Sequence, residues 1–76
     1  MELDILHRVT LLGVLKKKPD ESLEDVMEIL IDTGMYEKDE AKKVFVDLRA
    51  SGYIVGEGLS FIGVDAAQKA EREFRQ

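Results

Sequence analysis

A set of basic residues in the second half of the chain has the spacing of a helix surface. Its members are Lys38, Lys42, Lys43 and Arg49. At 100° per residue, one flank of such a helix carries Lys38, Lys42 and Arg49, whereas Lys43 lies near the middle of its outer face. Cations so arranged can contact the phosphates of a nucleic acid, and we predict these four as nucleic-acid-binding residues. The alternative is a solvated face with i,i+4 pairs such as Asp39 with Lys43.

The rest of that helix surface limits the contacts it could make. Its exposed middle carries Asp39, Val46 and Ala50, and none of these pairs with base edges as Asn, Gln or Arg do. Glu40 and Asp47 lie on the flank opposite the basic one. If this stretch binds DNA, we therefore expect it to hold the backbone rather than to read the bases.

An acidic region, residues 19–37, precedes the basic one. Every charged residue from Pro19 to Glu37 is Asp or Glu. Three of its carboxylates, together with Asp25, share the outward face of a predicted helix: Glu24, Glu28 and Asp32. These three could bind a partner protein with a basic surface, and the alternatives are a divalent cation or a merely solvated face. A cation needs several oxygens converging from a loop with defined spacing, which D-E-S-L-E-D lacks. We therefore expect no metal.

Residues suited to catalysis are scarce. His7 is the single histidine, cysteine is absent, and no nucleophile with a plausible base is evident. Ser22, Ser51 and Ser60 are explained as cap, turn and strand residues. No glycine-rich loop opens a helix, as phosphate binding would require. We expect no enzymatic activity and no cofactor, and we interpret His7 as a partly buried helix residue.

Length and charge restrict the class of protein further. Seventy-six residues are enough for one domain, which we place over 1–76. The formal net charge of -5 repels polyanions at long range, which weighs against nucleic-acid binding. The longest nearly apolar run, Val9–Leu15, is far shorter than the ~20 residues of a membrane span. The start, MELDIL, lacks the features of a secretory leader. We expect a cytoplasmic protein that does not associate with membranes.

Hydrophobic spacing predicts three helices in the first two thirds of the chain. The first covers residues 1–18, is apolar on most sides and is therefore expected at the centre of the fold. Its end, Lys16–Lys18, would add a second basic cluster if the fold brings it near the first. The second helix begins at Ser22 and ends at Gly34. The third begins at Lys38, stops at Gly52 and buries one face composed of Ala41, Val44, Phe45 and Leu48.

A short hairpin and a last helix complete the prediction. Residues 53–55 and 59–62 are typical of two strands, joined by a three-residue turn at 56–58. Gly63 would end the second strand, and Asp65 would cap a helix over 65–75. A small-residue stripe on that helix, Ala67 with Ala70, packs either on the first helix or across a homodimer. Three further residues are expected as exposed apolar groups for protein contacts: Met35, Tyr36 and Phe74.

The element order, with the strings A-K-K-V-F-V-D-L-R-A-S-G-Y-I and L-S-F-I-G-V-D-A-A-Q-K-A, resembles winged helix-turn-helix domains over the whole chain. The resemblance implies a mostly helical α+β fold with a three-helix core, a two-stranded wing and a C-terminal helix. It also implies a third helix in the DNA major groove, a second across the backbone, and dimerisation through terminal helices. The chain departs from this pattern in its acidic second helix and in Glu57 at the wing tip.

Two functions follow from these expectations. The first is a small DNA-binding domain of transcription-regulator type that makes weak phosphate-backbone contacts. The alternative is a protein-interaction module that keeps the winged-helix scaffold and does not bind nucleic acid. The resemblance favours the first, and the distribution of charge favours the second.

Overall fold

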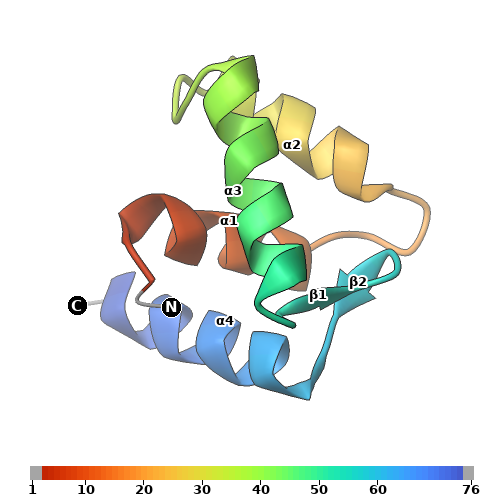
Figure 1. Ribbon diagram of the computed structural model, residues 1–76, viewed down its shortest axis with the longest axis vertical. Coiled ribbons are helices and arrows are strands. Elements are labelled where there is room, and N and C mark those ends of the chain that lie inside the picture. The colour runs from red at the N-terminus through yellow and green to blue at the C-terminus, as the bar shows by residue number, and fades with distance from the viewer. Residues whose placement is uncertain (1–2, 75–76) are drawn as a thin grey trace.

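A computed structural model describes residues 3–74, which form four helices and a small hairpin (Figure 1). The elements follow one another as α1 (Ile5–Leu15), α2 (Leu23–Asp32), α3 (Lys38–Ala50), β1 (Ile54–Val55), β2 (Gly58–Leu59) and α4 (Phe61–Phe74). The two strands pair antiparallel between α3 and α4. This arrangement confirms the predicted mostly helical α+β fold with a hairpin before a C-terminal helix.

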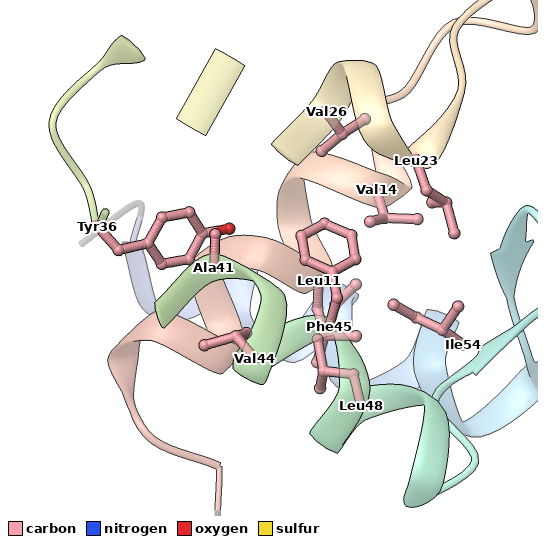
Figure 2. Packing of buried hydrophobic residues seen from close by; sticks show 11 residues of the cluster. Leu11, Val14, Leu23, Val26, Tyr36, Ala41, Val44, Phe45, Leu48 and Ile54 are labelled. Carbon is pink, nitrogen blue, oxygen red and sulfur yellow. The ribbon is translucent and has the colours of Figure 1, made fainter. Parts of the chain in front are cut away.

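Helix α1 lies at the centre of the molecule, as predicted. It contacts α2, α3, α4 and β2, and Figure 1 shows it between α4 on one side and the α2–α3 pair on the other. Because neighbours cover it on several sides, its apolar residues need not form a single stripe. Side chains from all the helices and β1 meet in the core, which includes Leu11, Val14, Leu23, Val26, Tyr36, Ala41, Val44, Phe45, Leu48, Ile54 and Ala67 (Figure 2).

Helix α1 is shorter than the first predicted helix, which covered residues 1–18. Residues 1–2 of that prediction lie outside the described residues. Helix α1 begins after Asp4, whose carboxylate accepts from the His7 backbone N–H at 3.0 Å. It ends at Leu15, and the lysines that follow belong to a loop. The Lys17 ammonium donates to the Glu21 carbonyl at 2.9 Å, so it stabilises that loop rather than the last helical turn.

The predicted ends of α2 and α3 are confirmed. Ser22 and Asp25 form a capping box, in which each side chain accepts from the other residue's backbone N–H. Gly34 and Gly52 follow α2 and α3 with φ of 83° each, a left-handed conformation that glycine adopts without strain. The four residues predicted for the inner face of α3 are all buried.

The prediction for the hairpin and α4 was wrong at three points. The turn has two residues rather than three, because Val55 pairs with Gly58. The second strand ends at Leu59, and α4 begins at Phe61 rather than near Asp65. Ser60 causes the early start: its hydroxyl accepts from the Gly63 N–H at 3.2 Å, and its carbonyl accepts from the Val64 N–H at 2.9 Å. The predicted end at residue 75 lies outside the described residues.

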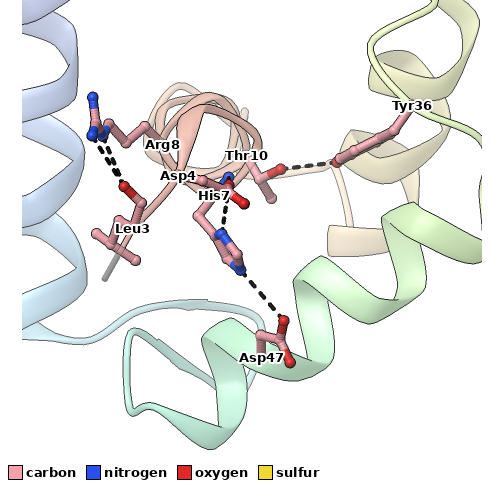
Figure 3. Close-up of polar contacts among 7 residues, drawn as sticks. All are labelled: Leu3, Asp4, His7, Arg8, Thr10, Tyr36 and Asp47. Carbon is pink, nitrogen blue, oxygen red and sulfur yellow. Dashed lines mark hydrogen bonds and ion pairs between the residues drawn. The ribbon is translucent and has the colours of Figure 1, made fainter. Parts of the chain in front are cut away.

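Tyr36 was predicted to be exposed and is instead 6% exposed, so that prediction was wrong. Its ring packs between α1 and α3, and its hydroxyl lies 2.9 Å from the Thr10 hydroxyl (Figures 2 and 3). Thr10 is fully buried, and this bond satisfies both polar groups. Burial raises the pKa of the Tyr36 phenol above its ordinary 10.0, because the charged phenolate is poorly solvated there.

Replacing Tyr36 by phenylalanine should lower the free energy of unfolding at pH 7 by about 1–2 kcal/mol, because the buried Thr10 hydroxyl loses its partner. The raised pKa adds a pH dependence. The neutral phenol stabilises the fold fully below pH ~10, and this contribution disappears as pH rises through the folded-state pKa. Urea unfolding from pH 7 to 11 should therefore show a steeper alkaline loss for the parent than for Tyr36→Phe. Equal alkaline losses would contradict this assignment.

Candidate functional site

An open groove of about 490 Å³ lies between α2 and α3. The two helices diverge from the turn at residues 33–37, and the hairpin lies toward the other end of α3 (Figure 1). Apolar side chains line its floor, and these are Leu23, Met27, Ile31 and Phe45. Figure 2 shows the Phe45 ring of α3 reaching toward α2, where Leu23 and Val26 lie. The groove therefore has the size and apolar lining of a binding cleft (~300–1,000 Å³).

Charged side chains of opposite sign border this floor. The α2 side, here called the acidic wall, consists of Glu24, Glu28 and Asp32. The α3 side, here called the basic wall, consists of Lys38, Lys42 and Arg49. Six of the seven predicted site residues thus line one groove, although the sequence suggested two separate surfaces. The seventh, Lys43, is exposed on α3 and does not line the groove.

The two walls do not neutralise each other by direct contact. Within residues 3–74, the ion pairs closer than 4.0 Å all involve other residues. Arg49 donates to the Gly56 carbonyl at 3.0 Å, which joins the end of α3 to the hairpin turn, and no carboxylate of residues 3–74 forms an ion pair with it. Both walls thus present charges that a bound molecule can reach.

Four of these six charges also work against the helices that carry them, whereas Glu24 and Arg49 suit the dipoles of their helix ends. Asp32 is the last residue of α2 and Lys38 is the first of α3, so each has the unfavourable sign for its end of a helix dipole. Like charges also stand at i,i+4 within each wall, as in Glu28 with Asp32 and Lys38 with Lys42. Each such pair destabilises a helix by a few tenths of a kcal/mol. Helix stability therefore does not explain the charges at positions 28, 32, 38 and 42.

The hairpin turn contacts both sides of the groove at one end, through Leu23 of α2 and Arg49 of α3. Glu57, at the turn, accepts from the Leu23 backbone N–H at 3.4 Å, and this carboxylate therefore lies at the N-terminus of α2. A negative charge is favourable there, because the first N–H groups of a helix have no partner within the helix. The charge expected to oppose DNA at the tip of the hairpin is thus directed toward α2.

Two lysines of the second basic cluster, Lys16–Lys18, bind other parts of the same chain through their ammonium groups. Lys16 forms an ion pair with Glu71 of α4 at 2.8 Å, and Lys17 bonds the loop carbonyl of Glu21. A further pair, Arg8 with Glu73 at 3.0 Å, also connects α1 to α4. None of these cations lines the α2–α3 groove.

The small-residue stripe of α4 is buried within the chain. Ala67 and Ala70 are covered, and α4 packs along α1. Packing on the first helix, one of the two predicted alternatives, therefore accounts for the stripe. Phe74 is partly exposed, as predicted, and Phe61 is 96% exposed at the start of α4.

His7 connects two elements of the fold. It is 8% exposed, with Nδ1 at 2.6 Å from Asp4 Oδ1 and Nε2 at 3.4 Å from Asp47 Oδ2 of α3 (Figure 3). The His7 backbone N–H, which donates to Asp4, is the main cause that lowers the pKa of that carboxyl. His7 is a helix residue, as predicted, but it is buried rather than partly buried, and its contacts join the start of α1 to α3.

The sequence alone did not identify the apolar floor of this groove. Met27 and Ile31 are only partly buried, and they separate the acidic wall from the basic one. Within the described part of the chain, no group of three or more His, Asp or Glu side chains could hold a metal ion. No helix in that part is long and apolar enough to cross a membrane. No family model, curated protein or solved structure matches the chain.

Proposed function

We propose that this chain is a protein-interaction module on a winged-helix scaffold and that the α2–α3 groove is its binding surface. One observation carries the proposal: an acidic wall faces a basic wall across an apolar floor. Apolar area supplies affinity on contact with a partner, whereas charges of both signs select among partners. The order of three helices, hairpin and helix supports the winged-helix assignment.

The same observation weighs against DNA as the main ligand. A phosphate held by Lys38 or Lys42 would also approach the carboxylates of the acidic wall, which repel it. Winged-helix DNA binding would also bring α2 close to the DNA backbone, and every charged residue of α2 is acidic. The net charge of -5 adds to the repulsion.

DNA binding remains the second candidate because of one specific feature. Lys38, Lys42 and Lys43 have no carboxylate within 4.0 Å among the described residues, so their charges are available to an anion. A protein that neutralises several phosphates binds DNA more tightly as salt is lowered. Low salt therefore separates the two candidates.

The test combines two measurements on the full chain. Fluorescence anisotropy with random duplex DNA at ~50 mM salt should show no binding at ~50 μM protein, where nonspecific binding would be evident. A photo-crosslinking amino acid at Met27, on the groove floor, should capture a protein from a lysate of the source organism. The same amino acid at Gln68, which is exposed on α4, should not capture it. Glu28→Lys should abolish capture at Met27, and mass spectrometry would identify the partner.

Two results would contradict this function. One is duplex binding that weakens with salt and is lost in Lys42→Glu, which would favour the DNA candidate. The other is equal capture from Met27 and Gln68, because a specific groove should distinguish those positions.

A further inference from the structure

The two walls carry side-chain charges of opposite sign along the whole length of the groove. Asp32 and Lys38 flank the turn at 33–37, where α2 ends and α3 begins. Glu24 and Arg49 lie at the opposite ends of the same helices, where Glu57 and Gly56 bring the hairpin close. Glu28 and Lys42 lie between these two pairs in sequence. A molecule lying along the groove would therefore have negative charge on one side and positive charge on the other at every level.

From this arrangement, and resting on the proposed function, we infer that the groove binds an amphipathic helix of a partner protein in one fixed direction. The partner helix would carry an apolar stripe with basic residues on one flank and acidic residues on the other. Its stripe would contact Met27, Ile31 and Phe45. Its basic flank would lie along the acidic wall and its acidic flank along the basic wall.

Charge complementarity selects this occupant over others. A nucleic acid presents one sign of charge and would be repelled by one wall. A helix that lays its apolar face into a groove uses side chains spaced at i, i+3, i+4 and i+7 and leaves both flanks facing the rims. Two flanks of opposite sign match two rims of opposite sign.

The fixed direction follows from geometry. A helix with its stripe in the groove has only two orientations, related by exchanging its ends, and this exchange also exchanges its flanks. In one orientation both flanks meet the opposite charge, and in the other both meet a like charge. Like charges in contact across an interface are strongly unfavourable, so a single direction is stable.

Two designed peptides of about 18 residues test this inference. Both carry a leucine stripe and the same numbers of Lys and Glu on an alanine background, which favours the helix at this length. The segregated peptide places Lys on one flank and Glu on the other, whereas the mixed peptide alternates them on both flanks. Anisotropy with labelled peptide should give a dissociation constant at least tenfold lower for the segregated peptide.

The direction of the bound peptide and its binding site are both measured on the complex of the protein with the segregated peptide. A spin label at the N-terminus of the segregated peptide should broaden amide signals mainly at one end of the groove, near Gly34 or near Glu57. A second peptide with its flanks exchanged should broaden the other end. Glu28→Lys in the protein should weaken binding of the segregated peptide about tenfold. Glu40→Lys makes the same charge change on α3 outside the groove and should have little effect.

Several outcomes would overturn the inference. These are equal affinity for segregated and mixed peptides, broadening at the same end for both flank arrangements, and no binding of either peptide at about 500 μM. Concentration-dependent self-association that is lost in Glu28→Lys would identify a second copy of this chain as the occupant instead. If the peptides fail while groove-dependent crosslinking at Met27 persists, the proposed function stands and the amphipathic helix alone is rejected.

Discussion

Replacing Gly63 by alanine should lower the free energy of unfolding by about 3 kcal/mol, the upper part of the range for overpacking a buried site. Gly63 is buried in the first turn of α4, directly against the segment that leaves α3. A Cβ atom there would lie 2.1 Å from the Tyr53 carbonyl oxygen and 3.2 Å from the Leu59 Cβ atom. The nearest obstacle is backbone, which cannot turn away as a flexible side chain can.

The close approach at Gly63 is held by several bonds. The Ser60 backbone N–H donates to the Tyr53 carbonyl at 3.0 Å, and the Ser60 hydroxyl also bonds the Gly52 carbonyl. A methyl group at Gly63 would push α4 away and break this connection. Because α4 covers α1, the loss should extend beyond the hairpin.

Gly58→Ala provides the matched control. Gly58 lies in the hairpin that precedes α4, has no atom within 4 Å of an added Cβ and has no positive φ. Its substitution should change stability by less than about 1 kcal/mol. Thermal unfolding followed by circular dichroism should therefore place Gly63→Ala more than ~10 °C below both the parent and Gly58→Ala. Equal midpoints for the two variants would show that the contact with Tyr53 is not needed.

The elements that sequence predicted best are those whose signals are local. Helix α3 buries Ala41, Val44, Phe45 and Leu48 because their spacing alone places them on one face. Helix α2 is defined by its own capping box, and both glycine ends follow from the conformation that glycine tolerates. None of these features requires knowledge of a distant segment.

The errors concern residues whose role depends on a distant segment. Phe61 and Ile62 have strand-like composition, but Ser60 starts a helix once its hydroxyl reaches Gly52 and Tyr53. Gly63 appeared to be a strand end because its neighbour, the Tyr53 carbonyl, is invisible in a local pattern. Tyr36 was assigned to the surface because its partner, Thr10, lies in another helix.

The sequence identified the two charged walls of the candidate site separately, but not the groove that they border. Each wall could be identified from spacing within a single helix, and all seven predicted site residues are exposed. Six of the seven line one groove because of the way α2 packs against α3. A helical wheel describes a single helix and contains no information on this packing. The floor residues Met27 and Ile31 were not identified as part of a site for the same reason.

Exchanging the charges of the two walls should reverse the direction in which a helix binds. The variant combines Glu28→Lys and Asp32→Lys on α2 with Lys38→Glu and Lys42→Glu on α3. All four residues are exposed, and the changes of charge cancel, so the net charge stays at -5. The new charges at 32 and 38 also suit their helix ends, so the variant should be at least as stable as the parent.

The corresponding measurement is the broadening of amide signals by the spin-labelled segregated peptide, recorded on the parent and on this variant. If the walls set the direction, the affected end of the groove should change from the turn at 33–37 to the hairpin at 56–57, or the reverse. Affinity should remain within about tenfold of the parent, because Glu24 and Arg49 are unchanged. Broadening at the same end in both proteins would contradict the claim that the two charged walls form one protein-binding groove.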